Sequence, residues 1–214
     1  MRPLRKPPGS MLVEMHCHTC EHSPCSEIAA VDLIKRAVTR GLDGVVLTDH
    51  HYQWTTAELQ TVRQAANCGS DFLLLSGQEV TTRDFDDVLV FGAAESFPFG
   101  VPLAHIREQA PAAAIVWAHP WRGINRPGLD RLFSPELDAI EIFNRNHRLV
   151  QNRHAYRQWH AWGFTATSGT DVHDELIGVF PTVFLTPVRC IDDLVRAIKE
   201  NRCRPYLKTS RAAQ

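Results

Sequence analysis

The sequence of 214 residues lacks any long uninterrupted apolar run. A helix that spans a bilayer needs about 20 mainly apolar residues, so we expect no transmembrane segment and no membrane partner. Neither sign of charge dominates, because 23 Lys and Arg stand against 24 Asp and Glu and give a formal net charge of -1. The sequence therefore has no overall electrostatic signature of a nucleic-acid or membrane-surface protein.

Two catalytic signatures are also missing. No G-x-x-x-x-G-K-[ST] loop occurs, which disfavours a P-loop NTPase. The segment SGT at 168–170 is not a nucleophile elbow, and no serine has a plausible triad. The opening MRPLRKPPGS is basic and proline-rich but lacks the apolar stretch of a signal peptide. We interpret 1–10 as a disordered tail and 11–214 as a single domain.

The six cysteines do not form the pattern of a disulfide framework. Three lie in 17–25 and three are scattered, and the domain is large enough to fold around its own core. Cys17 and Cys20 have the C-x-x-C spacing of a zinc ribbon or redox motif, but no second C-x-x-C follows. We therefore expect reduced thiols and a cytoplasmic protein.

Short apolar runs alternate with helical patterns along the chain, which is typical of an α/β protein. We expect strands at 11–16, 44–48, 71–77, 87–92, 112–118, 138–143, 164–169 and 182–186. We expect helices at 26–41, 56–67, 102–110, 129–134, 148–162 and 191–202, the first with Ser26 as its N-cap and Gly41 as its stop. This alternation predicts parallel pairing through crossovers, and about seven strand–helix units suit a closed or nearly closed barrel.

Polar residues with metal-binding chemistry follow several of these strands. His16 and His18 lie two apart, as do Asp171 and His173, so each pair can point to one side of an extended chain. Similar positions after other strands are occupied by His50, Glu79 and His119. The carboxyl ends of parallel strands form one rim, where α/β proteins build their sites. Histidine and carboxylate are the ligands of hydrolytic zinc, manganese or iron centres, so we expect a metal site at this rim.

In order along the chain, HCHT, GLDGVVLTDHH, GQEV, AHPW and GTDVH resemble the motifs of the PHP (polymerase and histidinol phosphatase) superfamily. The resemblance runs from about Met11 to Tyr206. It implies a distorted (β/α)7 barrel that holds two or three divalent metal ions and hydrolyses phosphate esters. It also implies that Glu79 bridges two ions. The further ligands that it implies are His16, His18, His50, His119, Asp171 and His173.

Two positions depart from the commonest motif of the family. Where it often has Asp-Gly or His after His-x-His, this chain reads TCEHSPCS. We expect His22 to be the ligand there, with Cys25 and Glu27 as weaker alternatives. Where many members have a histidine at the start of the strand after the bridging glutamate, the chain offers Asp87, with Asp86 as the alternate. A carboxylate there can bind a third ion.

These features favour a metal-dependent hydrolase of small phosphate esters, either monoesters or nucleotides. We expect a metal-bound hydroxide to attack phosphorus, with Zn, Mn or Fe ions and Arg122 balancing the charge, and with His51 in a supporting or proton-donating role. A phosphodiesterase or exonuclease acting on nucleic acid is the enzymatic alternative, and a stripe of Lys and Arg beside the rim would favour it. A non-catalytic, metal-stabilised interaction module and an amidohydrolase-like centre are the remaining alternatives.

Overall fold

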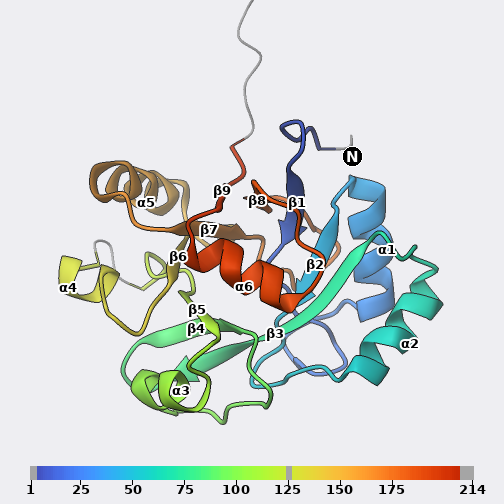
Figure 1. Ribbon diagram of the computed structural model, residues 1–214, viewed down its shortest axis with the longest axis horizontal. Helices are drawn as coiled ribbons and strands as arrows, with labels where there is room; N and C mark the ends of the chain where they lie inside the picture. The colour runs from blue at the N-terminus through green and yellow to red at the C-terminus, as the bar shows by residue number, and fades with distance from the viewer. Residues whose placement is uncertain (1–3, 124–126, 208–214) are drawn as a thin grey trace, which may run out of the picture.

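A computed structural model describes residues 4–123 and 127–207, and its central feature is one sheet of nine strands in the order β7-β6-β5-β4-β3-β2-β1-β8-β9. The strands surround the centre of the molecule. Most helices lie outside the strands, and the last helix, in red, lies across the middle of this view (Figure 1). Their bounds are β1 (Met11–Glu14), β2 (Gly44–Leu47), β3 (Leu73–Thr82), β4 (Asp86–Phe91), β5 (Ala114–Trp117), β6 (Ala139–Asn144), β7 (Ala166–Gly169), β8 (Thr182–Phe184) and β9 (Cys203–Pro205).

Two strands run against the other seven, so the prediction of purely parallel pairing is wrong there. β4 pairs antiparallel with both β3 and β5, and β8 pairs antiparallel with both β1 and β9. The physical reason at β4 is the short connection, because residues 83–85 cannot make the crossover of a dozen or more residues that parallel strands need. This hairpin also extends β3 beyond the predicted 71–77, because 77–82 pair with 86–91.

The two ends of the sheet meet through side chains. Thr182 Oγ1 donates to the carbonyl of Ser168 at 2.7 Å and accepts from its N–H at 2.9 Å. Ser168 Oγ in turn donates to the carbonyl of Pro181 at 2.8 Å. These bonds join β7 to the segment that begins β8, and β7 also contacts β9. The predicted α/β barrel is confirmed, with nine strands where eight were predicted. The additional strand, β9, is three residues long and has no apolar run that predicts it.

Helices cover both faces of the sheet. Figure 1 shows α1 and α2 together on one side and α5 on the opposite side. Neighbouring residues of one strand face different helices: Leu12 packs with Leu33 of α1, and Val13 packs in the cluster that contains Leu194 of α6. The helices are α1 (Ala30–Arg40), α2 (Thr56–Ala66), α3 (Leu103–Gln109), α4 (Leu129–Leu132), α5 (Leu149–Trp162) and α6 (Ile191–Lys199).

The first helix begins later than its sequence pattern predicts. Ser26 is not its N-cap, because α1 starts at Ala30 and the hydroxyl of Ser26 donates to the carbonyl of His18 at 2.9 Å. The carboxylate of Glu21 accepts the N–H of Ala30 at 3.0 Å instead. Gly41 ends the helix as predicted, with φ of 75°, a left-handed conformation that glycine adopts without strain. The residues between His18 and Ala30 are thus free to form a loop at the rim.

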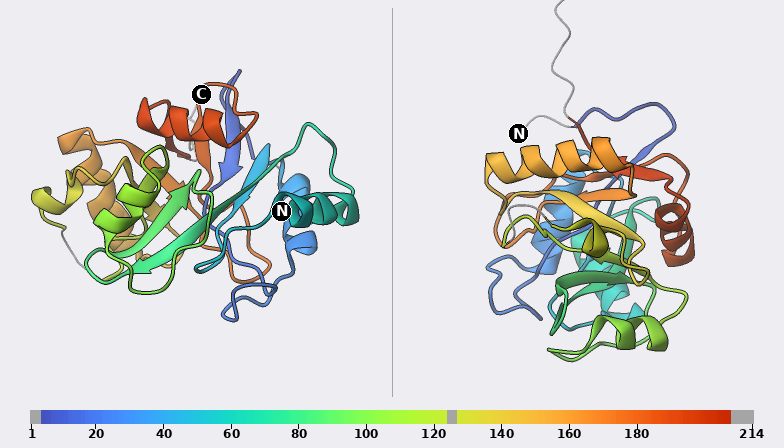
Figure 2. Two further views of the ribbon diagram at one scale, coloured as in Figure 1. Left: turned by 60° about the horizontal axis from the view of Figure 1, so that its bottom comes forward. Right: turned by 90° about the vertical axis from the view of Figure 1, so that its left-hand side faces the viewer.

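Part of the predicted tail contacts the barrel. The N–H of Leu4 donates to the carbonyl of Arg40 at 3.1 Å, its side chain packs on the core, and Lys6 forms an ion pair with Asp43. Residues 1–3 of that prediction lie outside the described residues. Among the helices that the structure describes, none is both long and apolar enough to cross a membrane. Figure 2 shows these elements from two further sides.

Barrel closure gives a testable expectation. Thr182→Val leaves the buried N–H of Ser168 without its acceptor, and we expect it to lower the free energy of unfolding by about 1–3 kcal/mol. Denaturant titration followed by circular dichroism measures the change. Thr61→Val is the matched control, because that exposed hydroxyl donates only to a carbonyl of its own helix. Equal effects of the two substitutions would show that the Ser168–Thr182 bonds do not stabilise the closure.

Candidate metal centre

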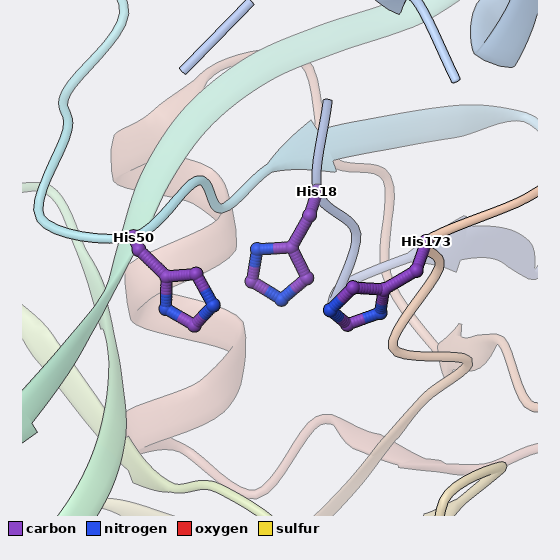
Figure 3. Close-up of side chains that lie close together, drawn as sticks. All are labelled: His18, His50 and His173. Atoms are coloured by element: carbon purple, nitrogen blue, oxygen red, sulfur yellow. The ribbon is translucent and has the colours of Figure 1, made fainter. Parts of the chain in front are cut away.

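Seven of the nine predicted ligands come together at one end of the barrel. Their ligand atoms form three overlapping groups, and within each group they lie within 4.8 Å of one another. The first group, shown in Figure 3, approaches from three separate loops of the chain. The groups are His18, His50 and His173; His16, Glu79 and His119; and His16, His18 and Asp171.

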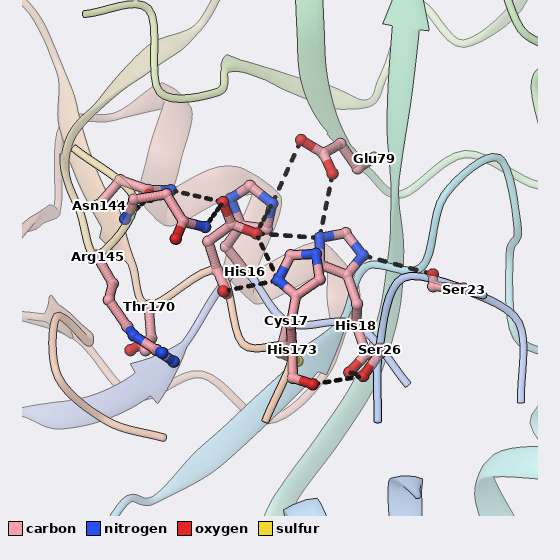
Figure 4. Close-up of polar contacts among 12 residues, drawn as sticks. His16, Cys17, His18, Ser23, Ser26, Glu79, Asn144, Arg145, Thr170 and His173 are labelled. Atoms are coloured by element: carbon pink, nitrogen blue, oxygen red, sulfur yellow. Dashed lines mark hydrogen bonds and ion pairs between the residues drawn. The ribbon is translucent and has the colours of Figure 1, made fainter. Parts of the chain in front are cut away.

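Glu79 lies at the middle of the cluster, inside β3. Its Oε1 is 3.0 Å from His119 Nε2 and 3.4 Å from His16 Nε2. Its Oε2 is 3.1 Å from His18 Nε2 and 3.2 Å from His50 Nδ1. Each carboxylate oxygen therefore faces its own pair of imidazoles, as Figure 4 shows for His16 and His18. This is the arrangement that one carboxylate needs to serve two ions.

Asp171 closes the cluster from the segment after β7. Its Oδ1 is 3.3 Å from His18 Nε2 and 3.4 Å from His16 Nε2. Its Oδ2 accepts the side-chain amide of Asn146 at 2.7 Å, which fixes the carboxylate. Asp171 has φ of 58° and His119 has φ of 31°, and both values are uncommon for residues with side chains. Such strain collects at functional sites.

The buried imidazole nitrogens test whether metal ions fit. His16 Nε2 and His18 Nε2 are buried and have no hydrogen-bond partner, although carboxylate oxygens lie only 3.1–3.4 Å away. A buried polar atom without a partner costs about 1–3 kcal/mol, so two at one point need an explanation. A shared cation supplies one, because nitrogen and oxygen ligands of one ion lie close together without bonding to each other. The donor set fits divalent metal ions such as zinc, manganese and iron.

Charges inside the cluster displace its ionisation equilibria. Burial lowers the pKa of His18, but its contacts with Asp171 and Glu79 outweigh burial and raise the pKa to about 9. Burial raises the pKa of Glu79, but His16 and the other imidazoles around it outweigh burial and hold the pKa well below its ordinary value. For the half-exposed His50, burial lowers the pKa. Without an ion, the cluster therefore holds protons where the ion would bind.

A buried acid orients the ligands, and the sequence analysis missed it. Glu141 Oε1 lies 3.1 Å from His16 Nδ1, and its Oε2 accepts the N–H of His119 at 3.0 Å and the amide of Asn144 at 2.9 Å. A carboxylate on the far nitrogen of a ligating imidazole fixes its tautomer and direction. Gly169 allows this approach, because a Cβ there would lie 2.3 Å from Glu141 Oε1. The sequence carries one signal of this role: Glu141 is an acid in the middle of the apolar strand AIEIF.

Two further acids hold the loops that carry the ligands. Asp49 is fully buried and accepts from Thr19, Ser23 and the indole N–H of Trp54, while Ser23 Oγ accepts the N–H of His50. Glu14, also fully buried, accepts from Thr170 and Gly178 on the loop of Asp171. Burial raises the pKa of Glu14 to about 7.

The structure does not bring His22 into the cluster. Its ring stacks on Tyr52 at 3.6 Å, and its Nε2 lies 3.5 Å from Glu58 Oε1. The alternatives Cys25 and Glu27 have exposed positions and belong to none of the three groups. The loop after His-x-His therefore contributes no ligand beyond His18 to the groups that the described residues form.

Asp87 lies beside the cluster and not inside it. Its Oδ2 is 3.9 Å from His119 Nε2, and its Oδ1 accepts the hydroxyl of Thr81 at 2.6 Å. Because β4 is antiparallel, its first residues lie at the rim where the neighbouring strands end. Asp86, the alternate, is 71% exposed in its side chain and pairs with Arg131. Of the two acids, Asp87 is therefore the one that faces the metal centre.

The two other predicted catalytic residues lie at the rim. Arg122 has a half-exposed side chain, and its guanidinium nitrogens are 3.4 Å from Asp87 Oδ2 and 4.0 Å from Asp171 Oδ2. The ring of His51 is 6.3 Å from that of His50, and its Nδ1 lies 3.2 Å from the carbonyl of Phe97. Neither residue belongs to a ligand group. Both residues lie beside the ligand groups and are partly exposed.

The fold of this barrel resembles that of solved structures, among them proteins described as PHP-like. No family model matches the chain. A curated relative, an uncharacterised protein of Methanocaldococcus jannaschii, is 27% identical over 121 residues, which are 55% of this chain and 67% of the relative.

The first similar structure is a two-domain protein from Bacteroides vulgatus that contains a predicted PHP-like metal-dependent phosphoesterase. It has a TM-score of 0.72 and 16% identity, over 95% of this chain and 68% of that one. An amidohydrolase from Chromobacterium violaceum with bound sulfate follows at 0.62 and 16%, over 90% and 97%. The lesion-specific endonuclease from Pyrococcus furiosus has a TM-score of 0.56 and 13% identity, over 89% and 56%. Because these three structures are only 13–16% identical to this chain, the similarity establishes the fold alone.

The role of Glu141 predicts an effect on metal affinity. Glu141→Gln removes the charge that orients His16, and we expect the affinity for divalent ions to fall about 10–100-fold while the barrel stays folded. Competition with a chromophoric chelator measures the affinity, and circular dichroism checks the fold. Glu95→Gln, an exposed substitution, is the control. Equal affinities of the two variants would contradict the orienting role.

Metal binding should release protons. With its pKa at about 9, His18 is protonated near neutral pH in the metal-free protein and must lose that proton to bind an ion. Affinity should therefore weaken as the pH falls, and His18 should contribute no release above its own pKa. Titration calorimetry at about pH 7.5, in two buffers of different ionisation enthalpy, measures the protons released. Heats that do not depend on the buffer would contradict this expectation.

Proposed function

We propose that this protein is a metal-dependent hydrolase of small phosphate esters, with two to three zinc, manganese or iron ions. The observation that carries the proposal is the position of Glu79, whose two oxygens face separate pairs of imidazoles. A carboxylate in this position would serve two ions at once. The predicted metal-dependent phosphoesterase in the similar Bacteroides vulgatus protein supports the same proposal.

The proposed ligands divide around Glu79. One ion would be held by His16, His119 and Glu79 Oε1. A second would be held by His18, His50, His173 and Glu79 Oε2. Asp87, which lies beside His119, would serve a third ion. Asp171 lies near both His16 and His18. Bound ions at such a site supply Lewis acidity, which lowers the pKa of a water and neutralises charge on phosphoryl oxygens.

The chain's own groups would bind and orient the ester. Arg122 offers a half-exposed guanidinium, which suits two-point contact with phosphoryl oxygens. Its present partners, Asp87 and Asp171, are at 3.4 and 4.0 Å, so the arginine is held at the rim without a tight bond that a substrate must break. When His51 carries protons on both ring nitrogens, its Nδ1 would donate to the carbonyl of Phe97 and its Nε2 would give a proton to the leaving oxygen, leaving a neutral imidazole.

The charge around the rim supports a small substrate over a nucleic acid. A duplex needs a row of free cationic side chains for its phosphates. The arginines here stand beside acids: Arg122 with Asp87, Arg131 with Asp86, and Arg145 in a two-point pair with Asp174 at 2.6 and 2.7 Å. The similarity to an endonuclease keeps a nucleic-acid substrate as the alternative.

The cysteines bear on the location of the protein. All six are free thiols, which fits the reducing cytoplasm that we propose for it.

A panel of phosphate esters tests the proposal. We expect the metal-replete protein to hydrolyse small monoesters faster than diesters or oligonucleotides. Glu79→Gln should lower turnover more than His119→Ala, because it weakens two ions and not one. Phosphate release and elemental analysis measure turnover and metal content, with the exposed His105→Ala as control. A metal-replete protein without activity on the panel, or a Glu79→Gln variant more active than His119→Ala, would contradict the proposal.

A further inference from the structure

A large apolar side chain stands exposed near the metal centre. Phe99 is 77% exposed, whereas Phe97, two residues earlier, is buried in the core. A single exposed phenylalanine on a surface is ordinary and needs no explanation by itself. Its position, its rigid support and the charge around it carry the argument that follows.

Two ring contacts connect Phe99 to the metal centre. His50, whose Nδ1 is 3.2 Å from Glu79, has its ring centroid 6.3 Å from that of His51. The ring of His51 meets that of Phe99 edge to face, at 5.8 Å and 67°. One side chain therefore separates the exposed ring from the proposed ligands.

The loop that carries Phe99 is fixed to the strand that carries Glu79. Gln78, next to Glu79, accepts the N–H of Phe97 at 2.7 Å and donates to the carbonyl of Glu95 at 2.8 Å. Gly100 has φ of 76°, and its N–H donates to the carbonyl of Thr81 at 2.8 Å. The loop is thus tied on both sides of Phe99, so the backbone that carries the exposed ring is already in place before a ligand arrives, and such preorganisation favours binding.

We propose that Phe99, with His51 beside it, is a stacking platform that selects phosphate esters carrying a planar ring, namely nucleoside monophosphates. This rests on the proposed function, which places the phosphate at the metal centre. Bases stack on aromatic side chains whatever their sequence, because every base has a π-face. The platform would hold the base while the ions and Arg122 hold the phosphate.

The charge near the platform favours one nucleotide over a longer strand. Residues 93–101 contain a single charged residue, the exposed Glu95, and residues 50–54 contain no Lys or Arg. A second or third phosphate of an oligonucleotide lying over this surface would find an acid and no cation. The substrate therefore places its one phosphate at the metal centre and a neutral ring on Phe99.

Matched substrates test the platform. AMP and ribose 5-phosphate share the phosphate and the sugar and differ in the base. We expect the wild-type protein to prefer AMP, as judged by kcat/KM, and Phe99→Ala to reduce that preference about tenfold, while Phe99→Tyr keeps it. Phe133→Ala is the matched control, because Phe133 is also exposed but contacts Phe164, which precedes β7 at the other end of the barrel. An unchanged preference in Phe99→Ala, or no preference in the wild type, would overturn the proposal.

A binding measurement separates this proposal from the proposed function. In metal-replete Phe99→Trp, AMP should quench the added indole fluorescence and ribose 5-phosphate should not. If AMP, ribose 5-phosphate and p-nitrophenyl phosphate all resist hydrolysis, the proposed function fails, and the quenching alone decides whether the platform binds a base. Equal quenching by both ligands, or by neither, would overturn the platform. Faster hydrolysis of a short 5′-phosphorylated single strand than of AMP would overturn its assignment to single nucleotides.

Discussion

The rest of the rim depends on one buried carboxylate among imidazoles. Glu79 is almost fully buried and lies within 3.4 Å of a nitrogen of His16, His18, His50 and His119. A buried charge that loses its partner destabilises a protein by about 3–5 kcal/mol, so the surrounding groups must be positioned accurately. The antiparallel β3–β4 hairpin provides that accuracy, because it extends β3 as regular strand past Glu79 and holds the acid on a fixed backbone.

A second layer of buried acids explains why the ligands converge. Three buried acids, Glu141, Asp49 and Glu14, belong to none of the ligand groups. Each accepts hydrogen bonds from a different loop that carries ligands. Each loop alone would vary its direction, and a metal centre tolerates little variation in ligand position. The strained backbone at Asp171 and His119 is stable for the same reason, since the surrounding bonds determine those conformations.

The two sides of the rim differ in chemistry, and this asymmetry relates to substrate choice. One side is polar, with the guanidinium of Arg122 and the amides of Asn144 and Asn146. The other side, formed by residues 50–54 and 93–101, is aromatic and contains no Lys or Arg. A substrate with an anionic end and a planar, uncharged end matches both sides. The first side comes from the loops after β5 and β6, and the second from the loops after β2 and β4.

The sequence by itself predicted the α/β barrel, the position of the stop at Gly41 and the residues that form the ligand groups. Those predictions rest on local patterns, namely apolar alternation and polar residues placed just after each strand. Only the tertiary structure decided the direction of β4 and β8, the existence of β9, the separation of His22 from the cluster and the orienting role of Glu141. The direction of β4 follows from its short connection to β3, at 83–85, whereas other features depend on a partner far along the chain: β8 on β1, and Glu141 on His16, 125 residues away. Local sequence carries no information about which distant group accepts a given hydrogen bond, and that pairing is what turns a set of histidines into a site.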